Sequence, residues 1–115
     1  MYHTQDPIIS AIIRTLEDKK GIDIRILDVR GISSYTDYLI LCSGASHTQV
    51  KALVSAVRDK FTGKDAPVYV NTSKDDTWWV LDFVDIVLHV FRQDTRLFYD
   101  LDSLWADAQS LPLPT

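Results

Sequence analysis

One stretch of the chain decides the fold: Thr36-Asp37-Tyr38-Leu39-Ile40-Leu41-Cys42-Ser43-Gly44-Ala45-Ser46. Residues 38–42 are apolar without interruption, which is typical of a strand buried on both faces of a sheet. Residues 43–45 turn the chain, and Ser46 with Gln49 three positions later makes a capping-box pattern that predicts a helix from about His47. A buried strand followed at once by a helix indicates an α/β protein.

The flanking sequence extends the alternation in both directions. Upstream, Asp6-Pro7 predicts a helix start, and apolar residues recur at three-to-four spacing as far as Leu16. The remaining expected elements are strands at 24–29, 68–70, 78–83 and 86–91 and a helical segment at about 96–105. This order predicts one domain over residues 1–108, with a mixed sheet of about five strands flanked by helices, and a flexible C-terminal tail over residues 109–115.

Composition excludes several classes of protein. The single cysteine, Cys42, rules out an intramolecular disulfide framework and a site built from several thiolates. No apolar run approaches the roughly 20 residues that a membrane-spanning helix needs. Residues 1–6 lack the features of a signal peptide, so the expected location is the cytoplasm.

The charge pattern bears on the partner. The net charge is −4, basic residues are scattered, and acidic residues accumulate between Asp75 and Asp107. A protein that binds the phosphates of nucleic acid needs clustered Lys and Arg. Because the basic residues here are scattered, little or no direct nucleic-acid binding is expected. An acidic surface can complement a basic protein, or it can simply keep the protein in solution.

Two further blocks accompany the opening stretch. Residues 78–91 read Trp-Trp-Val-Leu-Asp-Phe-Val-Asp-Ile-Val-Leu-His-Val-Phe, and residues 96–105 read Arg-Leu-Phe-Tyr-Asp-Leu-Asp-Ser-Leu-Trp. The three blocks occur in the order found in the Iojap-like family of ribosomal silencing factors. The chain resembles that family over nearly the whole domain, from about residue 8 to residue 108.

Two positions depart from the family's pattern. Val84 stands at a turn where the family usually has Gly, and Val strongly disfavours positive φ, so a different or looser turn is expected. Residues 73–76 replace the Glu-Gly that the family tends to carry ahead of the hairpin, which bears on the geometry of that loop.

The resemblance implies a fold similar to that of nucleotidyltransferases, without their activity. It also implies a partner, the basic large-subunit protein L-fourteen, at the surface where the small subunit docks. A factor seated there would block subunit joining and lower translation when nutrients are scarce. No enzyme activity, cofactor or metal is implied.

Alternation along a strand sorts the residues around the Trp pair. Trp79, Leu81 and Phe83 form an apolar face that is expected in the core, because successive side chains point to opposite sides of a sheet. The opposite face contains a polar member and is the better candidate for a partner. The residues predicted to bind a partner are Trp78, Val80, Asp82, His89, Arg96, Tyr99 and Trp105.

For several of these positions a structural role competes with binding. His89 on a strand face and Tyr99 at a helix entry could each serve the interior instead. An exposed apolar patch would also make a weak homodimer plausible.

A divergent metal-dependent nucleotidyltransferase is the alternative function. Residues 44–46 at a helix start could cradle a phosphate, and Asp82 or Asp85 could hold a metal ion. The acid-x-acid pair expected on the following strand is missing from residues 68–70. The three histidines are too dispersed to suggest a ligand cluster.

Overall fold

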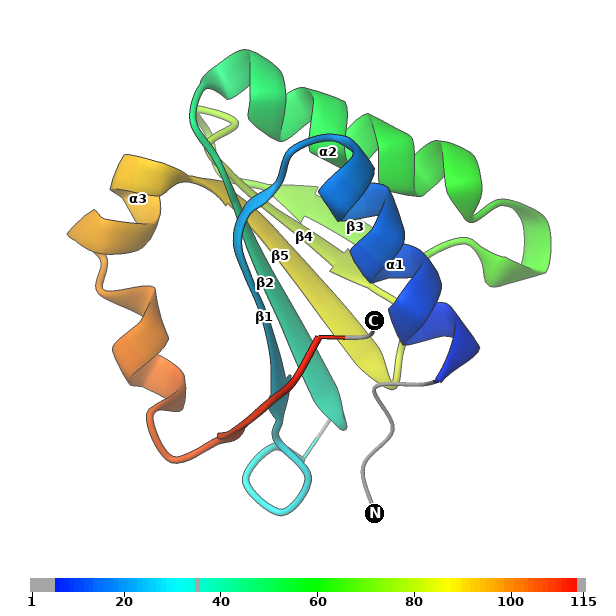
Figure 1. Cartoon of the computed structure of the whole chain (residues 1–115), viewed down its shortest axis with the longest axis vertical. Helices are drawn as coiled ribbons and strands as arrows, with labels where there is room; N and C mark the ends of the chain where they lie inside the picture. The colour runs from blue at the N-terminus through cyan, green and yellow to red at the C-terminus, as the bar shows by residue number, and fades with distance from the viewer. Residues whose placement is uncertain (1–5, 35, 114–115) are drawn as a thin grey trace.

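Six strands form one mixed sheet with helices on both of its faces (Figure 1). The structure, a computed structural model, describes residues 6–34 and 36–113, apart from the side chains of Leu101 and Leu104. The elements in chain order are α1 (Pro7–Asp18), β1 (Ile22–Asp28), β2 (Tyr38–Gly44), α2 (His47–Lys60), the 3-10 turn η1 (Gly63–Asp65), β3 (Tyr69–Thr72), β4 (Trp78–Asp82), β5 (Ile86–Arg92), α3 (Gln93–Phe98), the 3-10 turn η2 (Leu101–Trp105) and β6 (Gln109–Leu111).

The strand order is β3-β4-β5-β2-β1-β6. The central pair, β2 and β5, runs parallel, and every other neighbouring pair is antiparallel. All seven residues of β2 are buried, as its uninterrupted apolar sequence predicts. The predicted α/β class and mixed sheet are therefore confirmed.

The sixth strand corrects the expected C-terminal tail. Residues 109–111 pair with β1, with Ile26 opposite Leu111, and the Leu111 side chain is buried in the core. Three residues are too few to show a period-two pattern, and the neighbouring Pro112 suggested a break. The ordered sheet therefore reaches at least to Leu111.

Helices α1 and α2 cover one face of the sheet, here called the front face (Figure 1). Asp6 caps α1 by accepting from the backbone N–H of Ile8, and the capping box at α2 forms as predicted, with Ser46 Oγ accepting from Gln49 N at 3.1 Å. The Gln49 side chain also donates to the carbonyl of Lys20 at 2.8 Å, which ties the end of α1 to the start of α2. In the part of the chain that the structure describes, neither these helices nor α3 combines the length and apolarity needed to cross a bilayer.

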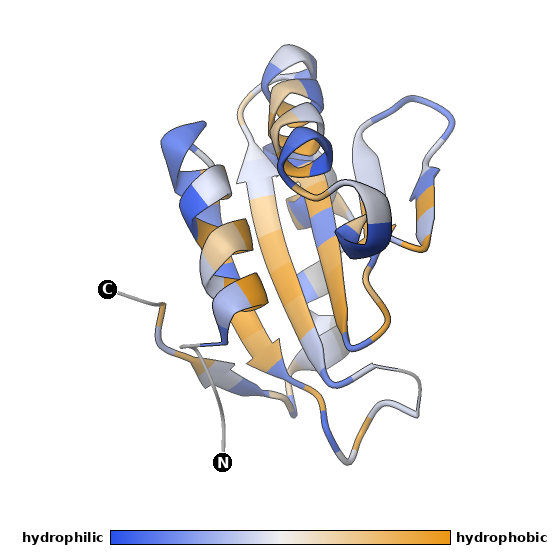
Figure 2. Ribbon diagram, turned by 90° about the vertical axis from the view of Figure 1, so that its right-hand side faces the viewer, coloured by the Kyte–Doolittle hydropathy of each residue, from blue (hydrophilic) through white to orange (hydrophobic). Residues whose placement is uncertain are grey.

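The opposite face, here called the back face, is only partly covered. Its buried apolar residues on β1, β2 and β5 pack against Trp105 and Ala108 of the C-terminal segment. Figure 2 shows mostly hydrophobic central strands beneath the helices. Strands β3 and β4 extend beyond this cover, so the side chains of β4 on the back face stay half-buried.

The turn between β4 and β5 contains strained backbone. Val84 has φ +79°, and the Asp85 N–H donates to the Phe83 carbonyl at 3.1 Å, which makes Val84 the centre of a γ-turn with positive φ. Asp82 Oδ1 accepts from the Val84 N–H at 2.7 Å and supports this geometry. The sequence predicted a turn of a different type or a looser one, because Val avoids positive φ; the structure shows a tight turn that nevertheless holds Val84 in that region.

Candidate functional site

The uncovered half of the back face brings together side chains from two strands. In the register of β3, β4 and β5, Tyr69 lies beside Asp82, Asn71 beside Val80, and Trp78 beside Phe91. We define the open face as the back-face residues of β3 and β4, which are Tyr69, Asn71, Trp78, Val80 and Asp82. On the other side of β4, Leu81 is buried and Trp79 packs on the front-face core. The predicted division of β4 into a core face and an outward face is confirmed.

Trp78 is the centre of an aromatic cluster. Its ring centroid lies 6.1 Å from that of His89, 6.2 Å from that of Phe91 and 6.2 Å from that of Tyr99. The indole Nε1–H donates to His89 Nδ1 at 3.1 Å, and the Trp105 ring packs on His89 from the other side at 5.4 Å. His89, Phe91 and Tyr99 therefore contact the half-buried Trp78 directly, and Trp105 contacts it through His89.

His89 belongs to the interior of this cluster. Because Nδ1 accepts the bond from Trp78, the neutral ring carries its proton on Nε2. Burial among aromatic rings lowers the pKa of His89 to about 4, since the charged form is poorly solvated there. His89 is therefore uncharged at neutral pH and orients the indole of Trp78.

Arg96 is a structural tether with almost no free surface. Its side chain is 6% exposed, and the guanidinium stacks 5.2 Å from the Phe91 ring centroid. Its hydrogen-bond acceptors come from three segments: the carbonyl of Asp23 at 2.9 Å, Ser43 Oγ at 2.9 Å, and both carboxylate oxygens of Asp102 at 2.9 and 3.3 Å. Hydrogen bonds from Arg96, with further help from Arg25, keep the pKa of Asp102 below its usual value. Arg96 thus holds α3 and η2 against the sheet, and little of it is left to touch a partner directly.

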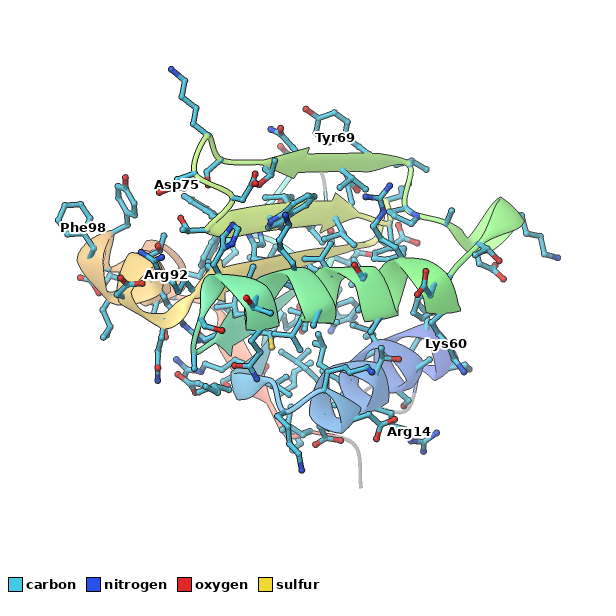
Figure 3. All side chains as sticks on the ribbon, turned by 90° about the horizontal axis from the view of Figure 1, so that it is seen from above. Arg14, Lys60, Tyr69, Asp75, Arg92 and Phe98 are labelled. Atoms are coloured by element: carbon cyan, nitrogen blue, oxygen red, sulfur yellow. The ribbon has the colours of Figure 1, made fainter. Side chains whose placement is uncertain are left out.

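The rim of the open face is built by the end of α3. Leu97, Phe98 and Tyr99 are all largely exposed, Phe98 to 81%. Phe98 and Tyr99, together with Trp78, border a groove of about 600 Å³ between α3 and the β3–β4 turn, where Arg92 pairs with Asp94 at 2.6 Å. Figure 3 shows Phe98 projecting outward at this end of the molecule, close to Arg92.

Sequence reasoning missed Phe98 and Tyr69 as surface aromatics. The signal for Phe98 was available, because three consecutive apolar residues on a helix cannot all face one sheet. Tyr69 lies on an edge strand of four residues, a length at which alternation carries little information. Tyr99, for which interface and core were both open, is exposed and yet reaches Trp78 with its ring.

Charge is unevenly divided along the chain. Residues 73–115 contain eight Asp and only three Lys or Arg, whereas residues 1–72 contain eight acidic and nine basic residues. Two of the three late cations are already paired, Arg92 with Asp94 and Arg96 with Asp102. The part of the chain that builds β4, β5 and the rim is therefore the acidic part.

The register of the central strands separates the residues that an enzyme would need together. Gly44 pairs with Arg92 at one end of the sheet, and Tyr38 pairs with Ile86 at the other, next to Asp85. Six residues of strand span about 20 Å, so the phosphate-turn candidate and the carboxylate candidates lie at opposite ends. Within residues 6–34 and 36–113, no three His, Cys, Asp or Glu side chains are grouped so that they could hold a metal ion.

Comparison with known proteins identifies the family. The family model for the ribosomal silencing factor during starvation, RsfS, matches residues 2–115. The ribosomal silencing factor RsfS of Bacillus subtilis is 37% identical over 105 residues, covering 90% of this chain and 89% of that protein. The chloroplastic protein Iojap of Zea mays is 31% identical, covering 90% of this chain and 46% of the maize protein.

A solved structure agrees with this assignment. The crystal structure of a protein from Chromobacterium violaceum superposes with a TM-score of 0.78 at 34% identity, covering 94% of this chain and 90% of that one. The chain belongs to the RsfS family of ribosomal silencing factors.

Proposed function

We propose that this chain binds the large ribosomal subunit through ribosomal protein L-fourteen and thereby blocks joining of the small subunit, which lowers translation under nutrient limitation. One observation supports this proposal independently of the family assignment. The open face and its rim expose aromatic side chains around a fixed tryptophan, on the acidic part of the chain. Aromatic anchors with charged surroundings are typical of protein interfaces.

The predicted binding residues divide into two roles. Trp78, Val80, Asp82 and Tyr99 have exposed surface and are the direct contacts in this proposal. His89, Arg96 and Trp105 support them, because they pack beneath Trp78 or tether the segment that carries Tyr99. A specific interface buries about 800 Å² and roughly 20–30 residues on each partner, so the five residues of the open face need the rim as well.

Electrostatics favours a basic protein over RNA as the partner. Carboxylates without clustered cations repel a phosphate backbone and attract a basic protein surface. The attraction should act mainly on the association rate, so added salt should slow binding more than it speeds release.

Co-sedimentation with purified large subunits tests the proposal. We expect the wild-type chain to sediment with large subunits, and Tyr99→Ala and Trp78→Ala to bind at least tenfold more weakly, since interface anchors typically contribute about 2 kcal/mol or more. Ile8→Ala is the matched control, because Ile8 is an exposed apolar residue on α1, on the other side of the sheet. Folded fractions are equalised first by urea titration of each variant.

The outcomes separate two claims. If the wild-type chain does not sediment with large subunits, the ribosomal assignment is wrong. If it sediments and the Trp78 and Tyr99 variants do so equally well, the ribosome remains the target and the open face is not the interface. A light-scattering assay of subunit joining then measures occlusion, which bound chain should inhibit in proportion to occupancy.

A further inference from the structure

A second apolar patch lies at the β4–β5 turn, at the far end of β4 from Trp78. Val68, Tyr69 and Val84 are all exposed there, and their backbone is hydrogen-bonded around Asp82. Val68 and Tyr69 are successive and point to opposite sides of the sheet, so this apolar surface wraps around the end of the hairpin. The Val68 N–H donates to the Asp82 carbonyl at 2.8 Å, Tyr69 pairs with Asp82 across the strands, and the Val84 N–H donates to Asp82 Oδ1 at 2.7 Å. We call these three apolar residues the hairpin-end patch.

Val84 is held in an unfavourable backbone conformation, although its side chain does not pack in the hydrophobic core. A β-branched residue at φ +79° is strained, because its side chain crowds the neighbouring carbonyl groups. Its side chain is 54% exposed and belongs to neither hydrophobic core. Glycine would adopt the same turn without strain. Strain that the interior does not use is characteristic of functional positions.

Three acidic residues lie at this end of the sheet, where the nearby cation, Arg30, is paired with Asp28. Asp82 and Asp85 flank Val84, and the Asp37 N–H donates to the Asp85 carbonyl at 3.1 Å, which brings a third acidic residue to this end of the sheet. None of these three carboxylates forms an ion pair with a residue that the structure describes. An apolar centre with an acidic border fits a basic protein surface.

The patch is continuous with the open face. Tyr69 and Asp82 belong to both, and β4 spans about 13 Å between Asp82 and Trp78. We propose that the hairpin-end patch is a second contact for the same basic partner, and that Val84 determines affinity there by presenting its methyl groups. This inference rests on the function proposed above.

The decisive variant is Val84→Gly, because the proposal predicts opposite changes in two measurements. Removal of the strain should raise the urea midpoint of unfolding. Loss of the two exposed methyl groups should weaken binding to purified large subunits about three- to tenfold. A variant that is more stable and binds less tightly separates a contact residue from a structural one.

Two companion variants test whether backbone flexibility or a general loss of exposed apolar surface could weaken binding instead. Val84→Asn tolerates positive φ without the flexibility of Gly and lacks the methyl groups, so it should bind as weakly as Val84→Gly. Ala52→Ser changes an exposed apolar side chain on α2, on the front face, and should bind like wild type.

Three results would overturn the inference. They are wild-type affinity in Val84→Gly, recovery of wild-type affinity in Val84→Asn, and a lowered urea midpoint in Val84→Gly. Failure of the wild-type chain itself to bind large subunits would instead reject the proposed function, and the second contact with it.

Discussion

Acidification from pH 7 to pH 5 should destabilise the folded chain through His89. Its pKa is about 4 in the folded state because the ring is buried between Trp78 and Trp105, and about 6.5 when the chain is unfolded. Since the unfolded state binds the proton more readily, stability is lost as the pH falls below 6.5 and the loss is complete near pH 4. At about 1.4 kcal/mol for each pKa unit, the full loss is about 3 kcal/mol, of which about 2 kcal/mol is reached by pH 5.

Urea unfolding followed by tryptophan fluorescence at pH 7, 6 and 5 measures this loss. His89→Gln is the control, because its amide oxygen can accept from the Trp78 indole and it does not titrate. The difference between wild type and His89→Gln isolates His89, because both chains share His47 and its neighbour Asp76. The pKa values of Asp28, Asp75, Asp94 and Asp102 are all lowered, so these groups stay ionised above pH 5. Equal losses in wild type and His89→Gln between pH 7 and pH 5 would refute the assignment to His89.

Three further changes test the interior. Asp102→Asn should cost about 2 kcal/mol of unfolding free energy in urea titration, because the buried Arg96 loses the nearer of its two carboxylate partners, whereas Asp94→Asn at an exposed pair should cost clearly less. Gly21→Ala should cost about 1–3 kcal/mol, since its Cβ would lie 2.6 Å from Cys42 Sγ; a cost that does not shrink in a Cys42→Ala background would contradict this reason. The Cys42 thiol, whose pKa burial raises to about 12, should react with a disulfide reagent at pH 8 only as fast as the chain opens, so that urea accelerates the reaction.

Local patterns in the sequence were enough to predict much of the fold. The capping box at Ser46 and the apolar run of β2 set the main boundaries, because both depend on residues within one turn or one strand. The division of β4 into two faces also follows from alternation alone. By contrast, the strand β6 depends on a partner more than 80 residues away, and no local pattern in three residues signals such a pairing.

The sequence predicted which residues belong to the site, but not which of their side chains are buried and which are exposed. The sequence pointed to Trp78, His89 and Tyr99, and the structure brings them into one cluster. The sequence left binding and interior roles open for His89 and did not predict the buried role of Arg96, because burial depends on how far the C-terminal segment folds back over the sheet. The positive φ of Val84 is similarly a property of the closed hairpin, in which neighbouring hydrogen bonds overrule a residue's own preference.

The parallel pairing of β2 with β5 also governs when the protein can fold. Tyr38 meets Ile86 only after helix α2 and strands β3 and β4 have been made, so the middle of the sheet closes late in synthesis. Before β5 is in place, the pairings of the folded sheet that remain available to these strands are β1 with β2 and β3 with β4, which would make two separate hairpins. The rate-limiting step of refolding should therefore be the docking of these two halves, and substitutions in β5 such as Leu88→Ala should slow folding more than equally destabilising changes in α1.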